Sequence, residues 1–318
     1  MKFPMLLPAL AVMTALIVPP ISAQPAPSPL SSAQEEAQWR QDLADWRAQH
    51  EKEVSAPDGW LTLAGLEWLK PGINSIGAAE GNKIKLPAPA PARLGLFTLS
   101  GNIVQLLSPV GGFPADLMID GQPAREGQIQ VGGIGGSKPS VIVWRNLTLI
   151  ALDRGGRVVL RIKDSNSATR AAFHGLHWFP PDPRQRIVAL WIPASPPRME
   201  KIPTVLGTTL DLPAPGVAEF TVNGQVLRLE PVLEPGEKES LFFILRDETS
   251  KSSTYQAARY LHTGLPNHGL NQEGVLVLDF NRLENPPCAY TPYATCPLPP
   301  EENRLPIALE AGEMRYEH

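Results

Sequence analysis

Prolines and glycines interrupt this sequence at short intervals and limit what it can fold into. The chain has 35 prolines and 26 glycines among its 318 residues. Proline removes a backbone donor and clashes with the preceding helical turn, and glycine also weakens helices. Here both residues separate short apolar or alternating runs, which is typical of strands joined by turns. The sequence therefore predicts a mainly β protein.

One segment, residues 32–55, is free of these interruptions and is predicted to be a helix. Its bulky side chains recur every three or four residues, as one face of a helix requires. They are Trp39, Leu43, Trp46, His50 and Val54. An Ala-Pro-Asp-Gly turn follows at 56–59 and ends the helix. We expect this stripe to pack against the β part of the protein.

Strand-like runs form two groups, and we predict one β domain from each. The first group comprises 60–69, 94–99, 103–107, 117–119, 141–144, 147–152 and 158–162. The second comprises 186–192, 217–222, 225–229, 241–245, 255–261 and 275–280. Tight hairpins are predicted at Asp120-Gly121 and Asn223-Gly224. The first group fits a β-sandwich over 56–165. The second predicts an antiparallel β domain over 166–318, which ends in a proline-rich loop that contains the cysteines.

The first 23 residues have the pattern of a cleavable secretion signal. Lys2 precedes an apolar run over 5–18, and small residues lead to a cleavage site near Ala23. The run is too short to span a bilayer comfortably. Residues 24–31 are rich in Pro, Ala and Ser and are predicted to be a disordered leader. We therefore expect an exported protein, periplasmic or secreted, without a membrane span.

The net charge argues against a nucleic-acid partner. The whole chain carries −4 at neutral pH, and removal of Lys2 with the signal would make this −5. Nucleic-acid binding requires a basic surface that neutralises phosphates. The sequence makes no prediction about the oligomeric state.

The two cysteines, Cys288 and Cys296, stand in the proline-rich loop. In an exported protein such a pair is expected to form a disulfide. The alternatives are a metal site or a nucleophilic cysteine with His174 or His262 as its base. The spacing does not match the usual zinc patterns. No phosphate-binding loop, nucleophile elbow or zinc-protease motif occurs, so neither a metal nor a cofactor is predicted.

Polar side chains gather in the C-terminal half, and we treat them as candidate binding residues. The candidates are Arg170, His174, Tyr255, Arg259, Asp279, Asn281, Arg282, Asn285, Tyr290, Tyr293, Glu310 and Glu313. Prolines would pre-order the loop that carries most of them. The alternative is that these groups satisfy the backbone of a segment without strands.

Two sets of motifs resemble a known family. The first set consists of Asp-Gly-Trp-Leu at 58–61 and Gly-Leu-Glu-Trp-Leu at 65–69. The second set consists of the run 279–300, Glu-Asn-Arg-Leu-Pro at 302–306 and Glu-Ala-Gly-Glu at 310–313. Over roughly residues 40–316 the chain resembles the domain-of-unknown-function 1684 family of bacterial and archaeal proteins. That family has no established activity, so the resemblance implies no function.

Residues 60–165 are similar to a forkhead-associated domain, a β-sandwich whose loops bind phosphothreonine. The resemblance rests on 73–77, 82–87 and 117–122. However, Ala78 stands where the phosphate-reading Arg would be, and 87–92 has no hydroxyl group. Charge-assisted bonds to a phosphate would therefore be missing. The resemblance implies the fold without the phosphopeptide function.

Two functions from different classes follow. The first is a non-enzymatic module whose 281–313 loop recognises a small molecule or peptide. The alternative is an extracytoplasmic hydrolase, which would use either a Cys288–His174 pair or carboxylates. The candidate carboxylates are Asp279, Glu310 and Glu313. Carboxylates divide acid and base roles only where their surroundings separate their pKa values.

Overall fold

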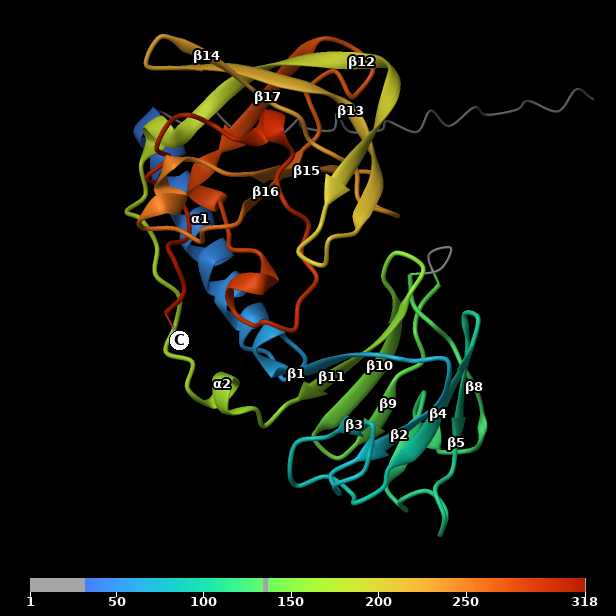
Figure 1. Ribbon diagram of the computed structural model, residues 1–318. Helices are drawn as coiled ribbons and strands as arrows, with labels where there is room; N and C mark the ends of the chain where they lie inside the picture. Colours follow the sequence, from blue (N-terminus) through green and yellow to red (C-terminus); the bar gives the residue numbers. More distant parts are fainter. Residues whose placement is uncertain (1–31, 134–136, 318) are drawn as a thin grey trace, which may run out of the picture.

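A computed structural model describes residues 32–133 and 137–317 (Figure 1). The predicted signal and leader, 1–31, lie outside the described residues. The protein is mainly β with one long N-terminal helix, as predicted. Within the described ranges, no helix combines the length and apolarity that a bilayer span needs.

Two facing sheets form the first β body, which we call the sandwich. One sheet has the strand order β1-β11-β10-β9-β6-β7, and the other β3-β2-β4-β5-β8. The bounds of the first sheet are β1 (Leu63–Trp68), β6 (Leu117–Ile119), β7 (Gln122–Pro123), β9 (Ile142–Trp144), β10 (Leu147–Asp153) and β11 (Val158–Asp164). Those of the second are β2 (Gly72–Gly77), β3 (Ile84–Lys85), β4 (Gly95–Ser100), β5 (Ile103–Leu107) and β8 (Gly127–Ile129). Phe97 of one sheet and Leu149 of the other share a fully buried apolar core.

The second β body, which we call the C-terminal body, is antiparallel. Its main sheet has the order β14-β13-β12-β17, and β15 pairs with β16. The strands are β12 (Arg186–Pro203), β13 (Thr209–Val222), β14 (Gln225–Leu229), β15 (Ser240–Leu245), β16 (Arg259–Gly264) and β17 (Gly274–Asp279). Trp191, Phe243 and Phe280 pack in one core between these sheets and the C-terminal loop. A further buried cluster joins Leu63 of the sandwich to Ile202 and Phe242 of the C-terminal body, and the domain bounds 56–165 and 166–318 stay a prediction.

Short helical turns and loops complete the chain. They are η1 (Trp60–Thr62), α2 (Ala168–Ala171), η3 (Pro183–Gln185), η4 (Glu248–Lys251), η5 (Phe280–Arg282), η6 (Pro287–Ala289) and η7 (Glu301–Asn303). The segment 165–185 runs from the sandwich to the C-terminal body and contains α2 (Figure 1). As predicted, the proline-rich 281–313 segment contributes no strand to any sheet.

Both predicted hairpins are confirmed by their backbone angles. Asp120 and Gly121 have φ values of 50° and 77°, and Asn223 and Gly224 have 51° and 79°. Two positive φ values in succession are what a type I′ turn requires.

The strands β12 and β13 are longer than the sequence predicts, because β12 continues through prolines that interrupt the strand pattern in the sequence. Beyond Trp191, β12 no longer pairs with β17, and its pairing with β13 is interrupted by an irregularity between Pro193 and Arg198, where Pro196 and Pro197 lie. A proline on a free strand edge removes no ladder hydrogen bond. The prolines of β12 are therefore compatible with a strand at this place.

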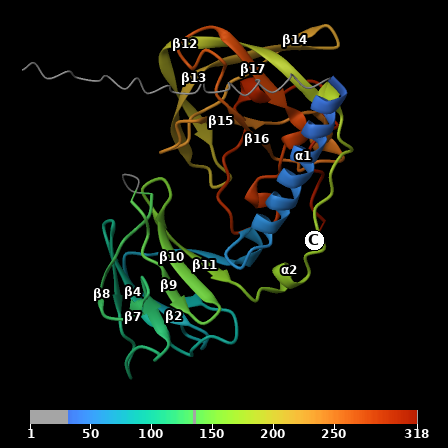
Figure 2. The same ribbon diagram turned by 180° about the vertical axis from the view of Figure 1, so that it is seen from behind.

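The helix α1 (Ser32–Val54) packs along the C-terminal body, as Figure 2 shows from behind. The side chains of Trp39 and Leu43 are 6% and 0% exposed. The Trp39 indole Nε1 donates a hydrogen bond to Asp279 Oδ2 at 2.7 Å. The predicted apolar stripe therefore does contact the β part of the protein.

We expect the substitution Trp39→Phe to lower the free energy of unfolding by about 1–3 kcal/mol, because it leaves the Asp279 carboxylate without its indole donor. Urea unfolding followed by circular dichroism measures the change. Gln41→Ala on the exposed face of the same helix should alter stability by less than about 0.5 kcal/mol. Equal effects of the two substitutions would contradict this account of docking.

Candidate functional site

A cavity of about 380 Å³ opens between the sandwich, helix α1 and the C-terminal body, and we call it the central cavity. Small-molecule sites in proteins commonly have a volume of this order. The sandwich contributes Trp60, Arg154 and Arg161, and α1 contributes His50. The C-terminal body contributes Glu234, Phe242, Tyr260, His262, Glu284, Asn285, Pro287, Tyr290, Ala294, Thr295, Cys296 and Pro297.

A buried carboxylate, Glu313, supports one wall of this cavity. Glu313 is 1% exposed and accepts hydrogen bonds from Asn285 N at 2.9 Å, Asn285 Nδ2 at 2.7 Å and Tyr290 OH at 2.7 Å. Burial and the charge of Glu313 raise the pKa of Tyr290, so its phenol stays protonated and donates. Three of the predicted site residues are thus brought together.

A chain of alternating carboxylates and imidazoles continues from Glu313 along the cavity. His50 lies between two carboxylates, with Nε2 3.3 Å from Glu313 Oε2 and Nδ1 3.2 Å from Glu284 Oε2. His262 likewise has Nδ1 3.5 Å from Glu284 Oε1 and Nε2 3.3 Å from Glu234 Oε2. Both nitrogens of each ring therefore face an acceptor.

These contacts set the charge of both imidazoles. Burial alone lowers the pKa of a histidine, but bonds to carboxylates outweigh burial here and raise the pKa of His50. They raise the pKa of His262 to about 9. The His262 ring is consequently a cation at neutral pH.

The sandwich side of the cavity is positive and lacks such compensation. Arg161 is 8% exposed, and its Nε has no hydrogen-bond partner among the described residues. Within 32–133 and 137–317, no carboxylate forms an ion pair with it. Its guanidinium lies 5.7 Å from the centre of the Trp60 ring. Burial and the nearby charge of Arg154 lower the pKa of Arg161 to about 10, so it too is a cation at neutral pH.

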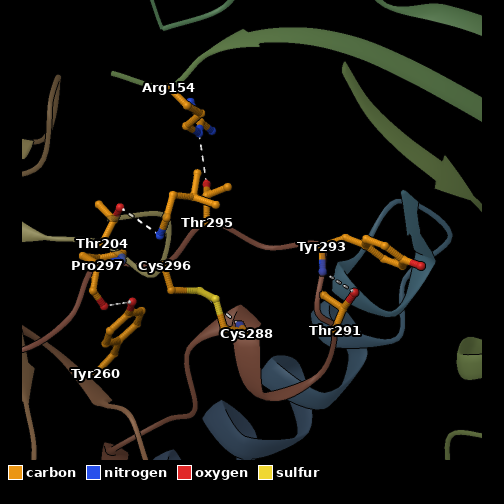
Figure 3. The surroundings of a disulfide bond; sticks show 10 residues. Arg154, Thr204, Tyr260, Cys288, Thr291, Tyr293, Thr295, Cys296 and Pro297 are labelled. Carbon is orange, nitrogen blue, oxygen red and sulfur yellow. Dashed lines mark hydrogen bonds between the residues drawn. A yellow bond between two sulfur atoms is a disulfide. The ribbon is translucent and has the colours of Figure 1, made fainter. Parts of the chain in front are cut away.

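The predicted disulfide is present and shapes the wall opposite Arg154 (Figure 3). Cys288 and Cys296 are joined with Cα atoms 6.1 Å apart, a usual disulfide separation. The loop is fixed on both sides, because Arg154 Nε donates to Thr295 Oγ1 at 3.0 Å and Tyr260 OH donates to Pro297 O at 2.8 Å. Since Cys288 is bonded to Cys296, it has no thiol for His174 to activate.

Arg259 and Asp247 form a buried ion pair at 2.9 Å within the C-terminal body. The Arg259 guanidinium also donates to Leu309 O at 2.9 Å and to Ala311 O. Its contacts therefore hold the C-terminal segment in place, and it does not line the central cavity.

A second group of candidates fixes helix α1 and its surroundings. Asp279 accepts the bond from Trp39, and Asn281 bonds Asp182 N and O at 2.9 Å each. Arg282 packs on the ring of Trp46 at 5.4 Å. The contacts of Asp279, Asn281 and Arg282 therefore fit the structural alternative, in which these polar groups stabilise a segment without strands and do not bind a ligand.

The remaining candidates are dispersed. Arg170 donates to Ser55 O at 2.7 Å and to Ser165 O at 2.9 Å. The side chains of His174 and Glu310 are exposed, and burial raises the pKa of the half-buried Tyr255. Tyr293 is on the disulfide loop, where its amide donates to Thr291 Oγ1 (Figure 3). None of these five lines the central cavity.

Sequence reasoning missed the residues that give the cavity its charge, namely His50, Arg154, Arg161, Glu234, Glu284 and, except as an alternative base, His262. Two features of the sequence point to these residues. His50 lies on the inward helical stripe, and Arg161 interrupts the apolar strand 158–162. In the described part of the chain, no group of three or more His, Cys, Asp or Glu side chains is arranged to hold a metal ion.

The chain is thus a two-bodied β protein with a charged cavity between its bodies, and it belongs to a family of proteins of unknown function (DUF1684). The family model matches residues 171–314. An uncharacterized protein of Haloarcula marismortui, with a solution NMR structure, is 31% identical; the match covers 46% of this chain and 78% of that chain, with a TM-score of 0.39. None of the curated proteins matches the chain.

The charge state of His262 yields a prediction that NMR can check. Its native pKa of about 9 exceeds the usual value of about 6.5 for an unfolded chain. Its protonation therefore stabilises the fold fully below pH 6.5, and this contribution disappears as the pH rises through 9.

An NMR titration of the imidazole nitrogens between pH 5 and pH 10.5 should place His262 near 9. Glu284→Gln should move the value downwards, because it removes one of the two facing carboxylates. A midpoint for His262 near 6.5 in the native protein would refute the carboxylate–imidazole chain.

Proposed function

We propose that this chain is an exported, non-enzymatic binding module, and that its ligand is a small molecule with an anionic group bound in the central cavity. The observation that carries this proposal is Arg161, a buried cation that borders the cavity without a facing carboxylate. Burial of a charge is costly unless a partner of opposite charge compensates it. An anionic ligand supplies that partner.

The chemistry of the cationic wall favours a carboxylate or a phosphate. A guanidinium presents several N–H donors in a planar fork that matches the oxygen atoms of these anions. Arg154 lies beside Arg161 and adds a second positive charge. The apolar ring of Trp60 covers one side of the Arg161 guanidinium and limits its access to water.

Binding fits the geometry better than catalysis. A general base needs a free lone pair within reach of the proton that it removes. Both ring nitrogens of His50 and of His262 already face carboxylates, and the His262 ring is a cation at neutral pH. The hydrolase alternative also has little support from its carboxylates, since Glu313 is occupied by donors and Glu310 is exposed.

The substitution Arg161→Met tests the proposal by separating stability from binding. It removes an uncompensated buried charge, so the ligand-free melting temperature should stay the same or rise. With benzoate at ten times its dissociation constant, the wild-type protein should melt about 2–4 °C higher. Arg161→Met should lose this shift.

Arg157→Met is the matched control for this experiment. Arg157 is an exposed arginine on the same sandwich, packs on Trp68 and does not line the cavity. Its variant should keep the full benzoate shift. The proposal fails if benzoate and inorganic phosphate leave the wild-type melting temperature unchanged, or if Arg161→Met responds as the wild type does.

Export is the second part of the proposal, and it is supported by the signal pattern of residues 1–23 and by the disulfide. Expressed with its own N-terminus in a bacterium, the protein should be recovered outside the cytoplasm, beginning at Gln24. Mass spectrometry of the intact protein measures this start. Recovery in the cytoplasm with residues 1–23 attached would disprove export.

A further inference from the structure

The outer edge of the Arg161 guanidinium is open to a ligand in the central cavity. Arg161 Nε is enclosed and unpaired, and Nη1 and Nη2 likewise form no hydrogen bond to any residue that the structure describes. Unlike Nε, however, Nη1 and Nη2 keep accessible surface, and Arg161 lines the cavity. Each of these two nitrogens carries two N–H groups, which an anion in the cavity can accept.

A second arginine, Arg154, is held in a fixed position and also has one free nitrogen. Its Nε donates to Thr295 Oγ1 at 3.0 Å, as Figure 3 shows, and its Nη1 donates to Asp153 O at 2.7 Å. Its Nη2 forms no hydrogen bond within 32–133 and 137–317 and keeps accessible surface. Two bonds thus fix the guanidinium, and the third nitrogen remains for a ligand.

The two guanidiniums act on the same side of the cavity. Arg154 follows β10, and Arg161 lies on β11, the strand that pairs with β10. Both line the cavity, and they lie close enough for the charge of Arg154 to lower the pKa of Arg161. The carboxylate of Glu284 across the cavity already lies between two imidazoles, His50 and His262. Two positive charges therefore border the cavity, and in the described part of the chain neither forms an ion pair with a carboxylate.

From these contacts we infer, on the basis of the proposed function, that the ligand is a phosphate monoester of a small organic group. A phosphate monoester carries nearly two negative charges at neutral pH and has three terminal oxygen atoms. Two of its oxygens match Arg161 Nη1 and Nη2, and the third accepts from Arg154 Nη2. A carboxylate, with two oxygens and one charge, compensates Arg161 and leaves Arg154 unpaired.

The apolar part of the lining accounts for the organic group. Trp60, Phe242 and Pro287 line the same cavity as the two arginines. The Phe242 ring is held between two neighbours, because the His262 ring stacks on it at 4.6 Å and the Tyr260 ring meets it edge-on at 4.9 Å. An organic group that covers these side chains buries apolar surface, which favours binding. A cavity of about 380 Å³ suits a ligand of this size.

Isothermal titration calorimetry on the full chain at pH 8 tests this inference with phenyl phosphate, phenyl sulfate and inorganic phosphate. Phenyl phosphate and phenyl sulfate have the same shape, but at this pH the phosphate has two charges and the sulfate one. The wild type should bind phenyl phosphate at least about tenfold more tightly than phenyl sulfate, because Arg154 pairs with the second charge. Inorganic phosphate should bind about tenfold more weakly than phenyl phosphate, because it covers no apolar lining.

Three variants test the role of the second arginine. Arg154→Met should reduce the preference for phenyl phosphate over phenyl sulfate to less than about threefold. Thr295→Val keeps the charge and removes the bond that positions Arg154, so it should weaken phenyl phosphate by about threefold. Arg157→Met, the exposed arginine outside the cavity, should keep the full preference. The ratio measured in the wild type tests the inference even where a variant does not fold.

The outcomes separate this inference from the proposal on which it rests. If phenyl phosphate and phenyl sulfate bind the wild type equally while benzoate still stabilises it, the dianion is refuted and anion binding stands. Retention of the full preference by Arg154→Met would also refute the inference, and equal binding of phenyl phosphate and inorganic phosphate would refute the organic group. If neither benzoate nor any of the three probes binds at 10 mM, both proposals are overturned.

Discussion

The arrangement of this protein around its cavity depends on one buried carboxylate, Glu313. Removing such a group from water is costly, and several donors must compensate it. These donors come from two parts of the chain: His50 from helix α1, and Tyr290 and Asn285 from the strand-free 281–313 segment. Glu313 thus joins helix α1 to both ends of the strand-free 281–313 segment.

The central cavity differs in electrostatic character between its two sides. On the side formed by helix α1 and the C-terminal body, carboxylates and imidazoles alternate, so that each ring lies between two carboxylates. On the sandwich, Arg154 and Arg161 lie close together without such a neighbour for Arg161. A compensated wall that faces an uncompensated one is the arrangement expected where a ligand contributes the missing charge.

Local features of the fold followed from the sequence, and long-range features did not. The helical stripe, the two glycine hairpins and the disulfide each depend on residues that are close in the chain, so their patterns were sufficient. The site required contacts such as that of His50 with Glu284, which are set by how helix and body pack. Asn285, Tyr290 and Glu313 were predicted because their loop is rich in polar groups, but Asp279 and Arg259 stand in the same region and hold the fold together. Only the packing of the folded chain distinguishes residues at the cavity from residues that stabilise the fold.

The hydrogen bond from Arg154 to Thr295 has a consequence for the order of events in folding. It joins residues 141 positions apart, and the cavity needs both of the bodies that these residues belong to. Closing a loop of this length costs conformational entropy, so we expect a contact of this kind to form late in folding. A chain with either body unfolded has no cavity, so the proposed binding requires that both bodies are folded and docked.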